Sequence, residues 1–261
     1  MSIGALHVAR TGLDAQGFRM QVIANNLANV NTTGFKRDRA VFEDMLYQNV
    51  KQAGGQTDAN SQAPTGLMLG TGVRVVATEK QHAQGNMVNT QNPLDIAIAG
   101  EGFFQIAQPD GTISYSRDGN FKLSNTGQIV TASGALLQPG ITIPTTASSV
   151  TFGRDGTVSI ELAAGGSQVI GQIQLARFVN PSGLESKGQN LMKETPASGA
   201  PQVFQPGVTG AGNLMQGTLE ASNVNVVEEM VNMIETQRAY EINSKAISAV
   251  DGMLKFINNN L

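Results

Sequence analysis

Hydrophobic residues recur every seven positions near the start of the chain. Leu6, Leu13, Met20 and Leu27 form one such series, and Ile23 falls three places after Met20. A repeat of seven with an intermediate position three residues later is typical of the seam of a coiled coil. The pattern predicts an N-terminal helix over residues 3–30.

The last forty residues carry a stricter version of the same repeat. The series consists of Val226, Met233, Tyr240, Ile247, Leu254 and Leu261, and a second apolar stripe begins with Val227, Met230, Val231 and Ile234. Asn225 is a suitable N-cap, and Glu228 stands at the third helical position, where a carboxylate is favourable. These signals predict a C-terminal helix over residues 226–257.

Two interpretations of the paired repeats are open. The helices can pair within one molecule and cover a sheet, which leaves the second stripe facing water. Alternatively, the two ends pair with each other and also pack against further copies, which would cover both stripes and is the interpretation we favour. The predicted assembly interface is Leu6, Leu13, Met20, Ile23 and Leu27 together with Val226, Met230, Met233, Tyr240, Ile247 and Leu254.

The middle of the chain changes to short apolar alternations separated by turn residues. Asp110-Gly111, Asp118-Gly119, residues 125–127 and Asp155-Gly156 punctuate these runs at spacings near eight residues. Such spacing favours antiparallel hairpins over a parallel sheet with crossover helices. The predicted fold class is α+β, with paired long terminal helices forming a coiled-coil layer and two all-β modules between them.

The predicted domain division has four parts. Residues 1–45 and 222–261 form the terminal helical domain, residues 67–99 and 200–221 an inner β module, and residues 100–199 an outer all-β domain. Residues 46–66 form an extended polar stretch, for which composition alone makes a flexible linker the default. A loop of this length is unusual in a compact protein, so a contact element is the alternative.

Composition argues against several classes of function. Charged residues make up 14% of the chain and the net charge is −3, so there is no basic surface of the kind that nucleic acid requires. No apolar run is long enough for direct membrane insertion, and the first residues lack the apolar segment of a cleaved signal peptide.

With two histidines, His7 and His82, and no cysteine, we expect no metal site and no cofactor. Asp95, Glu101, Asp110 and Asp118 could pair as catalytic carboxylates, but most of them lie at turns, so we expect no enzyme.

Three motifs, in the same order, resemble the bacterial flagellar rod and hook proteins. They are ANNLANVNTTGFKR at 24–37, GEGFFQI with YSRDGNFKLSNTGQIVTASG within 100–134, and LEASNVNVVEEMVNMIETQRAYEINSKAI at 219–247. The similarity covers essentially the whole chain and is greatest to the distal rod proteins of the basal body. Proximal rod proteins and hook proteins are the alternatives within the family. A trimeric β-rich adhesin or carbohydrate-binding module is the alternative from another class, although a chain without tryptophan is poorly supplied for binding sugars.

The resemblance implies a structural subunit that self-assembles into a rigid helical tube, with the terminal helices inside and the β domains outside. It implies torque transmission across the periplasm and export through the flagellar type III channel without a cleaved signal peptide. The implied partners are further copies of the chain, the proximal rod protein, the hook protein and the surrounding P-ring and L-ring proteins. It also assigns bracing between subunits to the polar stretch, represented by Tyr47, Gln48, Gln56, Pro64 and Gly66.

The family motif at the end of the N-terminal helix is rich in asparagine. It comprises Asn25, Asn26, Leu27, Ala28, Asn29, Gly34 and Phe35. We expect the buried amides to be hydrogen-bonded and to fix the register of packed helices, with Gly34 permitting the exit from the helix and Phe35 anchoring the turn. A frayed helix end with amides facing solvent is the alternative.

Overall fold

The computed structural model describes residues 2–54, 56–58, 61–62, 64–163, 165–208 and 210–259. The α+β class is confirmed, because one helix begins the chain, another ends it, and the described segments between them are rich in β-strands. The chain divides into two compact units. The helical unit combines residues 1–28, 38–79 and 225–261, and the β unit combines residues 29–37 and 80–224.

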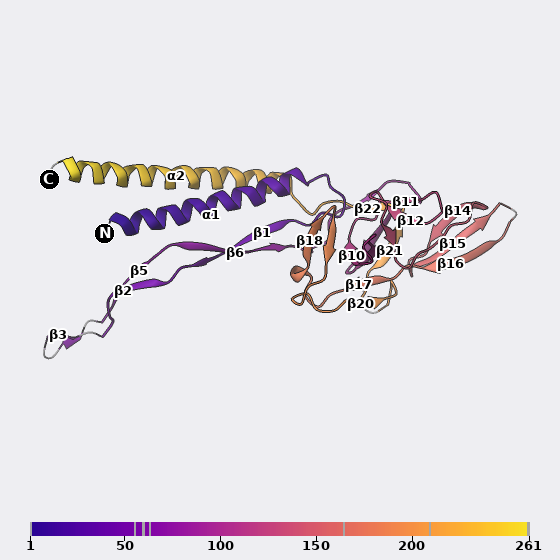
Figure 1. The fold of residues 1–261 in the computed structure, drawn as a ribbon, viewed down its shortest axis with the longest axis horizontal. Helices are drawn as coiled ribbons and strands as arrows, with labels where there is room; N and C mark the ends of the chain where they lie inside the picture. Colours follow the sequence, from indigo (N-terminus) through magenta and orange to yellow (C-terminus); the bar gives the residue numbers. More distant parts are fainter. Residues whose placement is uncertain are drawn as a thin grey trace. The chain divides into compact units, whose positions relative to one another are not determined.

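Two long helices dominate the helical unit. Helix α1 (Ser2–Ala28) and helix α2 (Val226–Asn259) run antiparallel and side by side, so that both termini lie at one end of the unit (Figure 1). Gly12 lies close to α2, since a Cβ placed there would be 3.2 Å from the amide nitrogen of Asn243. The predicted cap of α2 is confirmed: the side-chain oxygen of Asn225 accepts hydrogen bonds from the N–H groups of Val227 (3.1 Å) and Glu228 (3.5 Å).

The segment after α1 forms a long two-stranded ribbon. Strand β1 (Asp38–Asp44) pairs with β6 (Val73–Lys80), β2 (Tyr47–Lys51) with β5 (Leu67–Gly70), and β3 (Gln56–Asp58) with β4 (Ser61–Gln62). Two ion pairs between exposed side chains span the first pair of strands, Arg39 with Glu79 at 2.8 Å and Arg74 with Glu43 at 2.9 Å. The linker interpretation of residues 46–66 is therefore wrong where the chain is described, because backbone pairing orders both sides of this stretch.

The β unit is built from short antiparallel strands. The largest sheet has the order β11-β12-β13-β9-β10-β19-β18, with β17 pairing to both β9 and β20. A second sheet has the order β14-β15-β16, and two further pairs join β8 to β21 and β7 to β22. The strands are β7 (Met87–Asn89), β8 (Ile96–Ala99), β9 (Phe103–Ala107), β10 (Ile113–Ser116), β11 (Phe121–Leu123), β12 (Ile129–Thr131), β13 (Leu136–Leu137), β14 (Ala147–Phe152), β15 (Thr157–Leu162), β16 (Ser167–Gln172), β17 (Leu175–Arg177), β18 (Glu185–Gly188), β19 (Leu191–Lys193), β20 (Gln202–Phe204), β21 (Asn213–Gln216) and β22 (Thr218–Glu220), and a 3₁₀ turn, η1, spans Pro181–Gly183.

Three of the four turns that the sequence marked join paired strands of the β unit, whereas Asp118-Gly119 connects β10 to β11, which do not pair with each other, so the hairpin prediction is wrong there. Gly111, Gly127 and Gly156 adopt positive φ angles between successive strands, as the hairpin interpretation requires. The carboxylate of Asp110 accepts hydrogen bonds from the backbone N–H and the hydroxyl of Thr112, at 2.9 and 2.5 Å. This local bonding confirms that Asp110 serves a turn.

One main hydrophobic core fills the β unit. It includes Phe104 and Ile106 of β9 and Val158 and Ile160 of β15, so both sheets contribute to it. Ile96, Ile98 and Leu214, from the segments predicted to form an inner module, belong to the same core and are essentially inaccessible. The four-part division of the chain stays a prediction, and this shared core lies across its boundary at residues 99–100.

Candidate functional site

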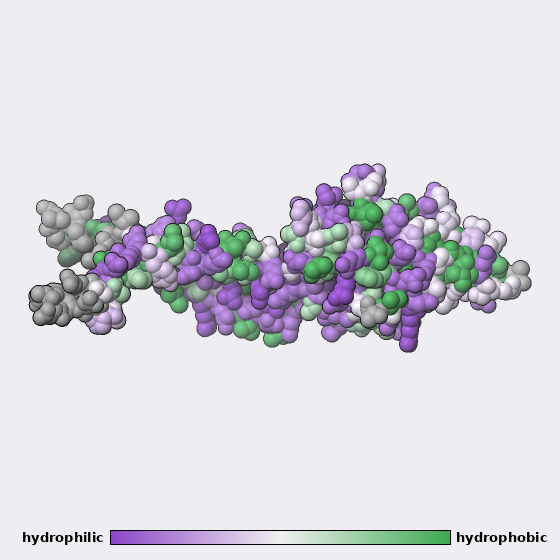
Figure 2. Space-filling model, turned by 90° about the horizontal axis from the view of Figure 1, so that it is seen from below, coloured by the Kyte–Doolittle hydropathy of each residue, from purple (hydrophilic) through white to green (hydrophobic). Residues whose placement is uncertain are grey.

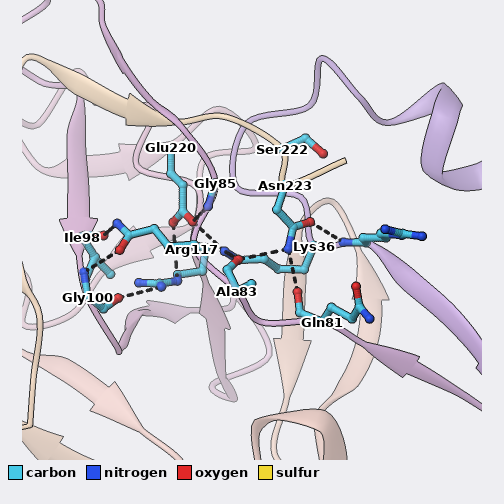
Figure 3. A network of polar contacts seen from close by, with 12 residues as sticks. Lys36, Gln81, Ala83, Gly85, Ile98, Gly100, Arg117, Glu220, Ser222 and Asn223 are labelled. Atoms are coloured by element: carbon cyan, nitrogen blue, oxygen red, sulfur yellow. Dashed lines mark hydrogen bonds and ion pairs between the residues drawn. The ribbon is translucent and has the colours of Figure 1, made fainter. Parts of the chain in front are cut away.

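A buried ion pair joins the first and third sequence motifs inside the β unit. The ammonium group of Lys36 lies 2.5 Å from Oε1 of Glu220, and each side chain is only 1% exposed (Figure 3). The backbone reinforces this contact, because the N–H of Gly34 donates to the carbonyl of Glu220 at 2.8 Å. Lys36 also donates to the carbonyl of Ala83 at 2.8 Å.

Arg117, from the second motif, completes this network. Its Nε lies 3.5 Å from Oε2 of Glu220, and its Nη2 donates to the carbonyl of Gly100 at 2.7 Å (Figure 3). Oε1 of Glu220 also accepts a hydrogen bond from the N–H of Gly85 at 2.8 Å. Burial lowers the pKa of Lys36 and of Arg117, although Glu220 opposes the shift in both cases. The network holds two cations against one anion, and it connects three segments far apart in the sequence.

A second set of bonds ties the same two chain segments together. The side-chain oxygen of Asn223 accepts from the N–H of Arg37 at 2.7 Å, and its amide nitrogen donates to the carbonyls of Gln81 (2.8 Å) and Ala83 (3.0 Å). The side-chain amide of Asn223 thus accepts one hydrogen bond and donates two, all with backbone groups, as a peptide group of a neighbouring strand could do. The chain entering and the chain leaving the β unit are held in one fixed arrangement.

The asparagine-rich motif is divided between the two units. Within the helical unit, Asn26 is buried and its amide makes two bonds with the peptide of Asp38, donating to the carbonyl at 2.8 Å and accepting from the N–H at 2.9 Å. Asn26 thus clamps the start of β1 against the end of α1 within one subunit. Of the other motif residues in this unit, Leu27 is half-buried, whereas Asn25 and Ala28 are exposed.

The remaining motif residues lie in the β unit. Asn29 is half-buried there, and Gly34 and Phe35 are buried. Gly34 has a φ of +67°, and a Cβ at this position would lie 2.7 Å from the backbone of Arg117 and of Asp118. The expectation that Gly34 permits a special backbone conformation is confirmed, and the close approach of Arg117 supplies a second reason for glycine.

The predicted assembly residues fall into three groups by exposure. Ile23 is buried in the helical unit. Leu6, Leu13, Met20, Leu27, Val226, Met233, Ile247 and Leu254 are half-buried, and Met230 and Tyr240 are exposed. Their role in assembly stays a prediction.

The second stripe of α2 faces solvent. Val227 is 71% exposed, and Met230, Val231 and Ile234 are each about half exposed. Ile242 and Met253, further toward the C-terminus, are also exposed. The helical unit therefore leaves the apolar face formed by Val227, Met230, Val231 and Ile234 uncovered, and Arg238 and Glu241 on the same side of α2 separate it from the apolar residues further along.

The ribbon exposes a further group of large hydrophobic side chains. Leu46 is 89% exposed, and Tyr47, Val50, Leu67 and Met68 are each more than half exposed. Figure 2 shows hydrophobic side chains reaching the surface on the face that it displays. Among the predicted bracing residues, Gln48 and Pro64 are exposed and Gly66 is half-buried, whereas the side chain of Gln56 lies outside the described residues.

The described part of the chain contains neither a candidate metal-binding cluster nor a helix suited to span a membrane. No group of three or more histidine, cysteine, aspartate or glutamate side chains in it is arranged to hold a metal ion. None of its helices combines the length and apolar character that a membrane crossing requires.

Three family models match the chain, and each contains one member of the buried ion network. A model described as flagella basal body rod protein matches residues 6–36, which include Lys36. The model of the flagellar hook protein FlgE/F/G D1 domain matches residues 97–160, which include Arg117, and the model of the C-terminal region of flagellar basal body rod FlgEFG proteins matches residues 215–260, which include Glu220.

Curated relatives are similar over nearly the full length. Flagellar basal-body rod protein FlgG of Buchnera aphidicola subsp. Acyrthosiphon pisum is 53% identical over 97% of this chain and 98% of its own length. The FlgG protein of Borreliella burgdorferi is 46% identical over 98% of this chain and 97% of its own length. The chain belongs to the FlgG family of flagellar basal-body rod proteins. This membership confirms the predicted resemblance to the distal rod proteins, and it does not favour a proximal rod protein, a hook protein or an adhesin.

Reasoning from the sequence missed the ion network of this FlgG-family chain. Lys36, Arg117 and Glu220 were not among the predicted site residues. A signal was present, because each of the three quoted motifs contains one of these charged residues. All three residues lie in the β unit, Lys36 in the segment by which the chain enters it and Glu220 in the segment by which the chain leaves it.

Proposed function

We propose that the chain is the structural subunit of the distal rod and that it acts by self-assembly into a rigid helical tube. In this proposal, α1 and α2 of neighbouring subunits form an inner coiled-coil layer and the β units face outward. The tube transmits torque across the periplasm and serves as the conduit for type III export. The chain itself would leave the cytoplasm through that conduit without a cleaved signal peptide, and it would carry out no catalysis.

The exposed face of α2 is the observation that carries this proposal. Val227, Met230, Val231 and Ile234 occupy one side of the first two turns of the helix, and each is at least half exposed. Burying a large aliphatic side chain contributes about 1.5–3 kcal/mol. Four such side chains per subunit, repeated along a tube, supply a driving force for association between identical chains.

The ribbon supports the same proposal independently. An isolated two-stranded ribbon is marginally stable in water, and this one exposes Leu46, Tyr47, Val50 and Met68. Contact with a neighbouring subunit would bury these side chains and brace the tube. The proposed partners beyond further copies of the chain are the proximal rod and hook proteins at the two ends, and the P-ring and L-ring proteins around the shaft.

Sedimentation and negative-stain microscopy of the full-length protein test the proposal. Wild-type protein should grow into open-ended tubes as its concentration rises, whereas Val231→Glu with Ile234→Glu should stay monomeric at the same concentration. Val169→Glu is the matched control, because Val169 of β16 is an exposed valine on the β unit. Circular dichroism should show that all variants keep their helices.

Two results would contradict the proposal. One is a discrete trimer that does not grow with concentration, which would instead fit the adhesin interpretation. The other is unchanged tube growth by the α2 variant. Removal of residues 47–66 tests the bracing role separately: we expect bent or unstable tubes, and straight tubes of normal stiffness would refute that role.

A further inference from the structure

A small pocket in the β unit lies beside the buried ion network. Its volume is about 170 Å³, and its walls include the rings of Phe103 and Phe178 and the side chains of Val179 and Pro181. Arg117 forms part of the lining. The pocket therefore combines an apolar wall with polar side chains, because His82, Glu101 and Arg177 also line it.

The guanidinium group of Arg117 has one nitrogen without a partner. Arg117 is 5% exposed, its Nε faces Glu220 and its Nη2 donates to the carbonyl of Gly100, as described above. Its Nη1 is buried and has no hydrogen-bond partner among the described residues. A buried donor left unpaired costs about 1–3 kcal/mol, and more when it is charged, so this nitrogen favours an acceptor.

Within the buried network beside the pocket, the positive charges outnumber the negative ones by one. Lys36 and Arg117 face the single carboxylate of Glu220. His82 lines the pocket without adding charge at neutral pH, because burial and the nearby cations lower its pKa to about 4. At the rim, Arg177 and Glu101 pair at 2.9 Å and cancel each other. Burial of a net charge is unfavourable unless an opposite charge approaches it.

We infer that this pocket binds a carboxylate group, either that of a small free acid or that of an aspartate or glutamate side chain of another chain. A carboxylate supplies one negative charge and two coplanar acceptors, which suit a guanidinium edge. Its carbon substituent can lie against Phe103, Phe178 and Val179. A phosphate dianion fits less well, because it carries more charge than the network lacks and has no apolar part.

Acetate is the probe, and nuclear magnetic resonance of the full-length protein at a dilute, monomeric concentration is the assay. Sodium acetate is exchanged for sodium chloride at constant ionic strength and pH 7, and the amide resonances of Gly102 and Val179 are followed. We expect saturable shifts with acetate in the millimolar range. Absence of saturation up to about 200 mM, or identical shifts with chloride alone, would overturn the inference.

Variants at the rim locate the binding without disturbing the core. Arg177 and Glu101 are well exposed, so their replacement should leave the fold intact. Arg177→Gln should weaken acetate binding about two- to fivefold, and Glu101→Gln should strengthen it by a similar factor, as expected for charges at a partly exposed site. Arg154→Gln, an exposed arginine away from the pocket, is the matched control. Equal affinities in all four proteins would place any acetate elsewhere and refute the inference.

A comparison of monomer and assembled protein distinguishes the two sources of the carboxylate. Saturation-transfer signals from acetate that disappear on assembly would show that a neighbouring chain fills the pocket. Signals that persist would identify a small free acid as the ligand. The titration of the monomer does not depend on assembly, so failure of the pocket inference and failure of the proposed function can be told apart.

Discussion

Replacement of one partner in the buried ion network should have strongly unequal effects. The wild-type network carries a net charge of +1, from Lys36, Arg117 and Glu220. Lys36→Met leaves a neutral pair, whereas Glu220→Gln leaves two buried cations without an anion. Both variants keep side chains of nearly the original size, so they change charge with little change in packing.

The magnitudes follow from burial. The Lys36 and Glu220 side chains are 1% exposed and Arg117 is 5% exposed, so solvent cannot screen the charges that remain. Breaking a buried ion pair by removing one partner typically costs about 3–5 kcal/mol, which we expect for Glu220→Gln. For Lys36→Met we expect about 1–3 kcal/mol, because the remaining arginine and glutamate still compensate each other. The double variant should lose less stability than the two single variants added together. Glu220→Gln alone leaves Lys36 and Arg117 without an anion, and the second substitution removes one of these two cations.

Urea unfolding of the monomeric protein, together with hydrogen exchange of the Gly85 and Phe104 amides, measures these differences within the β unit. Glu101→Gln is the control, because it breaks the exposed pair with Arg177 and should cost under about 1 kcal/mol. If Lys36→Met destabilises the β unit as much as Glu220→Gln, or if the two effects are additive, the charge imbalance does not govern the network and the reasoning fails.

Three further predictions concern the motif residues and pH. Gly34→Ala should lower the free energy of unfolding in urea by about 2–4 kcal/mol, because the new Cβ would lie 2.7 Å from backbone atoms. The control is Gly111→Ala, which has a similar φ but open space around the Cβ and should cost only about 1 kcal/mol. Equal losses in the two variants would exclude the steric cause. Asn26→Ala should cost about 2–3 kcal/mol by leaving the Asp38 peptide unpaired, and a loss under 0.5 kcal/mol would show that water replaces the clamp. The pKa of His82 is about 4 in the folded chain and near 6.5 when unfolded. As the pH falls, the unfolded state therefore binds a proton on His82 before the folded state does. The contribution of His82 to stability should be full above pH 6.5, and the free energy of unfolding should fall by up to about 3 kcal/mol toward pH 4. His82→Phe should flatten that part of the pH profile, and an unchanged profile would contradict this origin.

The terminal helices could be predicted because their signals are local. The cap at Asn225 and the seven-residue repeat after it lie within one continuous segment, and the helix ends two residues beyond the predicted position. Most hairpins of the β unit were predictable for the same reason, since an Asp-Gly or Asn-Thr-Gly sequence favours a turn within four residues; Asp118-Gly119 is the exception, because the strands on its two sides pair with other strands. In each case the residues that make the contact are neighbours in the sequence.

The ribbon gave no such signal. The side chains of β2 and β5 are exposed along the whole length of both strands, so polar and apolar residues need not alternate there, and residues 46–66 resemble a linker in composition. The register comes from backbone pairing, as where Tyr47 opposes Gly70 and Gln48 opposes Leu69. Its exposed hydrophobic residues have no partner on the ribbon itself, so their role in the proposed bracing of neighbouring subunits has no local signal in the sequence.

The ion network was hidden for a different reason. Lys36 and Glu220 are 184 residues apart, and lysine and glutamate are the residue types least often buried, so a local pattern assigns both to the surface. Each is nevertheless adjacent to a feature that does carry a signal: Lys36 follows the obligatory glycine at position 34, and Glu220 precedes the helix cap at Asn225. A charge is rarely buried without a partner of opposite sign. A lysine near the glycine and a glutamate near the helix cap are therefore candidates for a buried ion pair with each other. The buried pair then makes the correct meeting of the two segments a condition for a stable β unit, because either charge alone would be buried without compensation.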